Sequence, residues 1–230
     1  MEETIGRSQW MLLIFVLLQA AAEARMEFKI AKTWDDRPLD HESTKISFQT
    51  DGNFIVMNVT APFFNDPPAP RGAAGQPFKN LFDYEVVEAF FLGQDDKYLE
   101  VELSPHGQHL VLLLSGRRNV IKMCLPMSYD VSIWDNHWYG IARIPKTYFP
   151  PRIRRFNAYA IHGSGERRHY EALYPVPRNR FEQPDFHRLD YFGYLSFSVI
   201  FSVGHSLSDV WHDALENYEK GLTCEASHSK

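Results

Sequence analysis

Cysteine is scarce in this sequence, with only Cys124 and Cys224 among 230 residues. They lie 100 positions apart and form no CxxC motif, so the sequence lacks the cysteine spacing of a zinc or iron–sulfur site. A chain of this length buries a core large enough to be stable without a disulfide, so two free thiols are expected. The pair does not indicate the redox compartment of the protein.

The sequence also lacks an apolar run long enough to span a membrane. Residues 11–22 form an apolar run of 12 residues, and Ala22-Glu23-Ala24 matches the A-x-A pattern of signal-peptide cleavage. We interpret residues 1–25 as a signal-like leader or an alternative N-terminal extension, because Met26 is a natural domain start. The protein is expected to be secreted if residues 1–24 are a cleaved signal peptide and cytoplasmic otherwise, with no integral membrane span when mature.

An excess of positive charge is missing as well. The chain has 24 Lys and Arg against 29 Asp and Glu, a formal net charge of −5. Proteins that bind nucleic acid need a basic surface that displaces counterions from phosphates. No nucleic-acid partner is therefore expected.

The sequence is instead rich in aromatic residues, at 14%, and in turn signals, with 14 Pro and 13 Gly. Residues 42–50 and 53–61 read as two strands joined by Asp51-Gly52, a strong hairpin signal. Residues 83–92 and 98–104 form a second pair of strands. Residues 156–176 form a third hairpin with a charged, glycine-rich tip. Short strands with turn signals every 8 to 12 residues are typical of an all-β antiparallel sandwich.

We predict that residues 26–201 form one β-sandwich domain and residues 202–230 a short C-terminal helix and tail. Leu207, Val210 and Trp211 recur at helical spacing, which predicts a helix over residues 206–221. The Pro- and Gly-rich residues 61–80 form a long loop, and residues 144–151 contain one helical turn.

The hairpin tip HGSGE (162–166) resembles a nucleophile elbow only superficially, because a strand rather than a helix follows Ser164. It is interpreted as a solvated turn. His106 and His109 lack the spacing of a metal site, so no metal or cofactor is expected.

Four carboxylates lie on the second pair of strands, at positions 85, 88, 100 and 102. Glu100 and Glu102, two positions apart, meet the spacing that glycoside hydrolysis requires. These strand acids are expected to lie on an exposed strand face in contact with solvent, because such acids serve solubility. Glu88 differs because it interrupts an apolar stretch, where a carboxylate needs a hydrogen-bonding partner.

Several long blocks closely resemble uncharacterised protein family 0462. They are DYEVVEAFF (83–91), YLEVELSPHGQHLVLLLSGRRN (98–119), RFNAYAIHG (155–163) and PDFHRLDYFGYLSF (184–197). The likeness extends from about Met26 to Phe197, and its members begin at the equivalent of Met26. That family is in turn similar, more distantly, to family 9 carbohydrate-binding modules and DOMON-like domains, which are antiparallel β-sandwiches.

This resemblance implies a set of ligand-binding residues. Glu88 falls on a strand glutamate that bonds to sugar hydroxyls, and Phe82 lies where sugar-binding members have a first stacking tryptophan. Tyr84 and Arg117 would flank them. Leu173 lies where those members have their second tryptophan, so the chain departs from the two-ring clamp.

The sequence therefore predicts a non-catalytic module that binds a carbohydrate or another polyhydroxylated small molecule. An alternative is a protein-interaction adaptor that uses residues 61–80 and 206–220 as its contact surface. A glycoside hydrolase using Glu100 with Glu102 or Glu88 is a further alternative, as is a haem site using Met57 and His162.

Overall fold

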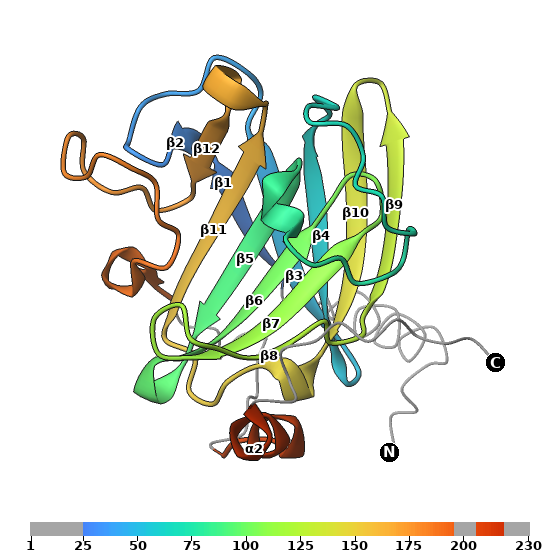
Figure 1. Ribbon diagram of the computed structural model, residues 1–230, viewed down its shortest axis with the longest axis vertical. Helices are drawn as coiled ribbons and strands as arrows, with labels where there is room; N and C mark the ends of the chain where they lie inside the picture. The colour runs from blue at the N-terminus through green and yellow to red at the C-terminus, as the bar shows by residue number, and fades with distance from the viewer. Residues whose placement is uncertain (1–24, 196–205, 219–230) are drawn as a thin grey trace, which may run out of the picture.

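The computed structural model describes residues 25–195 and 206–218, which form two antiparallel sheets packed face to face (Figure 1). The smaller sheet has the strand order β1 (Arg25–Ile30), β3 (Thr44–Asp51), β4 (Phe54–Pro62), β10 (His137–Pro145), β9 (Ser128–Trp134). The larger sheet has the order β2 (Lys32–Thr33), β12 (His169–Ala172), β11 (Arg155–His162), β5 (Val86–Leu92), β6 (Lys97–Leu103), β7 (His109–Ser115), β8 (Val120–Met123). The short β13 (Gly193–Tyr194) also pairs with β11. The predicted antiparallel β-sandwich is confirmed.

The hairpins form where the turn signals placed them. Asp51 pairs with Phe54 across a two-residue turn in which Gly52 has φ +54°. The β11–β12 turn depends on Gly163, whose φ is +79° and whose Cβ, if present, would lie 2.0 Å from the carbonyl oxygen of Arg167. Only glycine meets both conditions, so the tip is a tight turn whose backbone is fixed by its sequence.

The larger sheet is covered on both faces. One face contributes Ala89, Phe91 and Val101 to the core between the two sheets. The other, outer face contributes Phe90 and Leu112 to a second apolar cluster beneath the connecting segments. Because the sheet is covered on both faces, the residues of β7 from 110 to 114 are apolar without interruption.

The C-terminal helix α2 spans Asp209–Glu216, shorter than the predicted range of 206–221, of which residues 219–221 lie outside the described part. Its Trp211 is fully buried in the core between the sheets, and its Nε1 donates a 3.0 Å hydrogen bond to the carbonyl oxygen of Tyr148. Tyr148 ends the 3₁₀ turn Lys146–Tyr148, which confirms the helical turn expected there.

Two further expectations concern the cysteines and the N-terminal segment. Cys124 is disulfide-bonded, so the expectation of two free thiols is wrong. Residues 1–24, the signal-like leader, lie outside the described residues. Among the residues that are described, no helix has both the length and the apolar character needed to cross a membrane.

Candidate ligand-binding cleft

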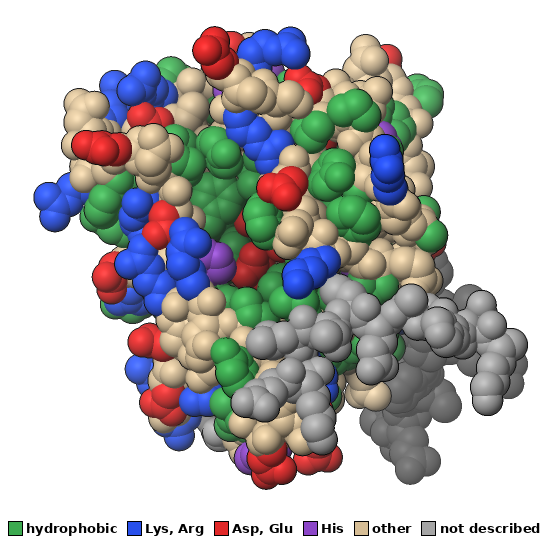
Figure 2. All heavy atoms as spheres, in the orientation of Figure 1, with side chains coloured by type: hydrophobic (Ala, Val, Ile, Leu, Met, Phe, Trp, Pro, Cys, Tyr) green, Lys and Arg blue, Asp and Glu red, His purple; other side chains and the backbone are tan. Residues whose placement is uncertain are grey.

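A cleft of about 550 Å³ lies on the outer face of the larger sheet, and we call it the outer cleft. Figure 2 shows a hollow on this face, with apolar and acidic side chains inside it and basic side chains along its rim. Its base is formed by Glu88 on β5, Glu100 on β6 and Ile161 on β11. Its walls come from residues 82–83, from the hairpin tip 164–168 with Tyr170 of β12, and from residues 184–187, together with Pro67 and Arg118. Such a volume is typical of a small-molecule site.

Three glutamates from adjacent strands lie together beneath this cleft. Glu88 of β5 pairs in register with Glu102 of β6, and Phe90 pairs with Glu100, so all three carboxylates share the outer face. They are 2%, 5% and 1% exposed for Glu88, Glu100 and Glu102. The expectation of solvated acids on an exposed strand face is therefore wrong, because this face is covered by the connecting segments.

Burial makes these acids hard to ionise. Desolvation raises the pKa of Glu100 to about 8, although Glu102 and Arg118 favour its charged form. Desolvation, together with the charge of Glu100, raises the pKa values of Glu88 and Glu102 well above the ordinary value. Burial therefore favours the protonated form of all three groups, in which each carboxylic acid can donate one hydrogen bond and accept others.

Aromatic rings form much of the cleft wall. Phe82 is 47% exposed and stands on the 3₁₀ turn Leu81–Asp83. Tyr170 and Phe186 line the cleft from the other side, and Phe186 is stacked on Tyr159 with ring centroids 3.8 Å apart. His187 lies beside them, with Nδ1 2.8 Å from the hydroxyl of Tyr98, and burial lowers its pKa to about 4. The cleft thus combines flat apolar faces with a neutral imidazole.

Two arginines hold the walls in place. Arg168 donates hydrogen bonds to the backbone carbonyls of Phe82, Asp83 and Gly163, which ties the 3₁₀ turn to the β11–β12 hairpin. Arg118 donates a 2.7 Å hydrogen bond to Asp185, which also accepts from Arg117. Both cleft-lining arginines are therefore already paired with partners in the protein, so little positive charge is left for an anionic ligand.

Of the four residues that the resemblance assigns to ligand binding, only two lie in the outer cleft. Glu88 and Phe82 line the outer cleft, whereas Tyr84 and Arg117 do not. Tyr84 packs edge-on against Phe78, with centroids 5.6 Å apart, and Arg117 faces solvent. Leu173 packs against the core between the sheets, away from the cleft lining.

The cleft also contains residues that the sequence analysis did not assign to a ligand. Ser164 and Arg168 of the hairpin tip line it, as do Glu100, Phe186 and His187. The alternation in β6 placed Glu100 on the same face as Tyr98, and that signal could have found it. No local pattern indicates His187, which reaches the cleft from 99 positions beyond Glu88.

The segment RFNAY (155–159) of β11 has a structural role beside the cleft. Asn157 is fully buried, and its Oδ1 accepts hydrogen bonds from the backbone of Ala158 and Tyr174, at 2.9 and 3.0 Å. Its Nδ2 donates to the hydroxyl of Tyr159 at 2.8 Å. This block therefore orients Tyr159, on which Phe186 is stacked.

The two packed antiparallel sheets define the class of fold, a β-sandwich with the outer cleft on one of its faces. A candidate carbohydrate-binding protein from Bacteroides uniformis has a similar structure, with a TM-score of 0.56 and 16% sequence identity. The match covers 80% of this chain and 90% of that one. A family 9 carbohydrate-binding module from Caldicellulosiruptor kristjanssonii, solved with cellotriose, aligns with a TM-score of 0.41 and 11% identity. It covers 65% of this chain and 72% of that one, a likeness too low to support a conclusion.

The chain belongs to the UPF0462 family. It is 56% identical over 179 residues to the rat UPF0462 protein C4orf33 homolog and 54% identical over 179 residues to human UPF0462 protein C4orf33. Both alignments cover 76% of this chain and 90% of the relative. The zebrafish homolog is 54% identical over 171 residues, covering 73% of this chain and 87% of that protein. No protein-family model matches the chain.

Proposed function

We propose that the protein is a non-catalytic binding module whose outer cleft holds a neutral, polyhydroxylated small molecule such as a carbohydrate. The observation that carries this proposal is the base of the cleft, where Glu88 and Glu100 lie buried beneath aromatic walls. Among the described residues, Oε2 of Glu100 has no hydrogen-bond partner, so a ligand hydroxyl can pair with it. The candidate carbohydrate-binding protein of similar fold is consistent with this ligand class.

The charge of the cleft selects against ionic ligands. A cation would need ionised carboxylates at the base, but burial raises the pKa values of Glu88 and Glu100. An anion would need available guanidinium groups, but Arg118 and Arg168 are bonded to Asp185 and to backbone carbonyls. Sugar hydroxyls suit groups that both donate and accept, and sugar C–H faces suit the rings of Phe82 and Phe186.

The carboxylate geometry does not favour glycoside hydrolysis by Glu100 with Glu102. Their carboxyl groups lie within hydrogen-bonding reach of each other. A retaining enzyme needs about 5 Å between its two carboxyl groups and an inverting enzyme needs more. Burial also raises the pKa values of both groups, whereas such an enzyme needs one of them ionised.

Replacing the half-exposed ring on the cleft wall tests the proposal. We expect Phe82→Ala to weaken binding of the best saccharide ligand by about tenfold, because one stacking face is worth roughly 1 kcal/mol or more. Thermal stability should change little, because the Phe82 side chain is 47% exposed. Calorimetric titration of the full chain measures the change in affinity.

Trp134→Ala is the matched control, since Trp134 is 70% exposed and lies outside the cleft lining. It should bind the ligand as the wild type does. Equal affinity in wild type and Phe82→Ala would contradict the proposed site, and loss in both variants would place binding elsewhere.

A further inference from the structure

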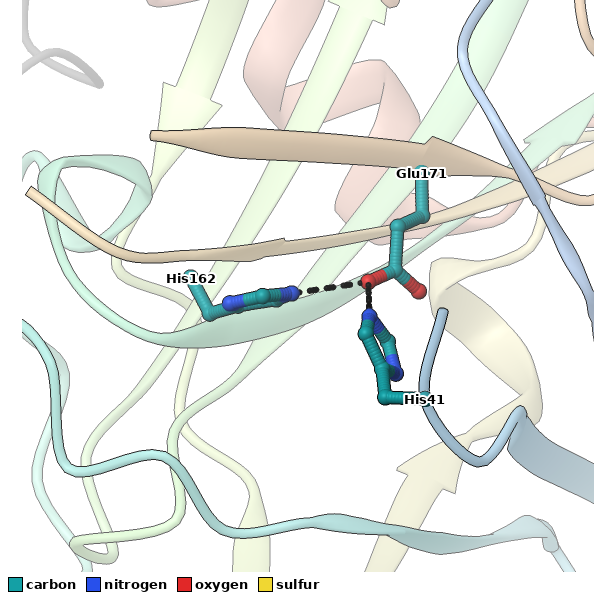
Figure 3. Close-up of side chains that lie close together, drawn as sticks. All are labelled: His41, His162 and Glu171. Atoms are coloured by element: carbon teal, nitrogen blue, oxygen red, sulfur yellow. Dashed lines mark hydrogen bonds and ion pairs between the residues drawn. The ribbon is translucent and has the colours of Figure 1, made fainter. Parts of the chain in front are cut away.

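Three potential metal ligands meet at the edge of the sandwich, and we call them the His–Glu cluster (Figure 3). His41 comes from the connection between β2 and β3, His162 ends β11, and Glu171 lies on β12. Nε2 of His41 is 3.1 Å from Oε1 of Glu171, and Nε2 of His162 is 2.9 Å from the same oxygen. None of the three residues lines the outer cleft.

We propose that the His–Glu cluster binds a divalent transition-metal ion, for which zinc is the natural probe. Two imidazoles and one carboxylate form a donor set that zinc and other borderline metal ions accept. In a tetrahedral zinc site, bonds of about 2.0–2.1 Å place neighbouring ligand atoms roughly 3.3 Å apart. The two N–O distances are within a few tenths of an ångström of that value.

The distance between the imidazole nitrogens of His41 and His162 requires only a small adjustment. All three ligand atoms lie within 4.8 Å of one another, so the two imidazole nitrogens must approach by up to about 1.5 Å. His41 can make this movement because it lies outside the regular strands and its side chain is 19% exposed. His162 and Glu171 are buried on paired strands and keep their positions.

The ring orientations are those of metal ligands. Nδ1 of His41 lies 2.9 Å from the carbonyl oxygen of Glu42, so a proton on Nδ1 leaves Nε2 to face the cluster. Metal-bound histidines usually donate their second ring nitrogen in this way. The His162 ring is held between Phe64 and His169, stacked on each with centroids 3.6 and 5.0 Å apart. Binding would replace the hydrogens that now join the two Nε2 atoms to Glu171.

A second, independent observation indicates a missing ligand. Oε2 of Glu171, which is 1% exposed, has no hydrogen-bond partner among the described residues, and the same holds for Oε2 of buried Glu85. Glu171, His162 and Glu85 line a common cavity of about 10 Å³, which is room for one small species. Unpaired buried oxygens cost free energy, and coordination of a cation would compensate for it.

A metal ion here would join two parts of the chain that are distant in sequence. It would attach the connection bearing His41 to the β11–β12 hairpin, whose tip also forms a wall of the outer cleft. The sequence does not indicate this site, because His41 lies far along the chain from the hairpin that bears His162 and Glu171. Only the packing of this connection against the sheet brings them together.

Zinc titration of the full chain by calorimetry tests the proposal. We expect the wild type to bind zinc at this site, and His41→Gln or Glu171→Gln to weaken that binding by at least about 100-fold, since even loss of an outer-shell partner costs about 10–100-fold. His137→Gln is the matched control, because His137 forms a similar 2.9 Å pair with Glu42 at the surface. It should leave the affinity unchanged.

A measurement on the wild type keeps the test independent of variant folding. In NMR spectra of the imidazole nitrogens, zinc should shift the signals of His41 and His162 and leave that of His137 in place. Absence of zinc binding, or binding that perturbs neither His41 nor His162, would overturn the proposal. Equal affinity in the folded His41→Gln variant would do the same.

Discussion

Glu100→Gln is expected to stabilise the protein at pH 8 by about 2–4 kcal/mol and to flatten the dependence of its stability on pH. Glutamine has the shape of the protonated acid and cannot ionise. In the wild type, burial raises the pKa of Glu100 to about 8. The folded protein therefore keeps a proton on Glu100 that the unfolded chain loses near pH 4.5. The folded state is therefore disfavoured as the pH rises.

The sign of this effect fixes the pH window. A carboxyl group whose pKa is raised by folding contributes fully to stability below its unfolded pKa, and this contribution falls by about 1.4 kcal/mol per pH unit up to the folded pKa. His109 and His187 act in the opposite direction, because burial lowers both pKa values to about 4 and their contribution is lost as the pH falls below 6.5. Between pH 6.5 and 8 the glutamates dominate.

Chemical denaturation of the two proteins at pH 6.5, 7 and 8 measures the difference. Glu182→Gln, at an exposed position, is the control and should follow the wild type. A wild-type stability that rises from pH 6.5 to 8, or a Glu100→Gln variant less stable than the wild type at pH 8, would show that Glu100 is ionised in the folded state.

Trp211→Ala is expected to lower the free energy of unfolding by about 3–5 kcal/mol, the usual cost of removing a large buried ring. Trp211 is 0% exposed, packs in the core between the sheets and donates a hydrogen bond to the carbonyl of Tyr148. A loss of this size would show that α2, although it has only eight residues, is an integral part of the sandwich fold.

Urea denaturation measures this cost, with Leu215→Ala as the control on the same helix, since Leu215 is 39% exposed. Trp211→Phe should fall between the two, because it keeps most of the packing and loses the hydrogen bond. A Trp211→Ala protein with wild-type stability would mean that α2 detaches in solution.

Most of the fold could be predicted from the sequence because its signals are local. The Asp51-Gly52 hairpin and the pairing of residues 83–92 with residues 98–104 each depend on neighbouring residues, and both are confirmed. The state of the strand glutamates was predicted wrongly. Alternation showed which face Glu100 and Glu102 share, but not that distant segments cover this face.

The residues of the outer cleft could also be predicted only in part. Resemblance placed Phe82 and Glu88 in a candidate site, and both line the outer cleft, although their roles there remain predictions. Phe186 and His187 reach the cleft through the long connection after β12, whose path is set by the orientation of Asn157 and Tyr159. No local pattern encodes such a path. The His–Glu cluster depends in the same way on contact between two distant parts of the chain, the connection bearing His41 and the β11–β12 hairpin.

Calorimetric titration of the full chain with a panel of mono- and oligosaccharides tests the central claim most directly, with Glu88→Leu as the paired variant. Leucine fills the volume of Glu88 and removes its hydrogen-bonding group at a position that is 2% exposed. We predict a saccharide that binds in the micromolar to millimolar range, about −8 to −4 kcal/mol, and no binding by the folded variant. If no saccharide of the panel binds, or if Glu88→Leu binds as tightly as the wild type, a sugar-binding role for the outer cleft is contradicted.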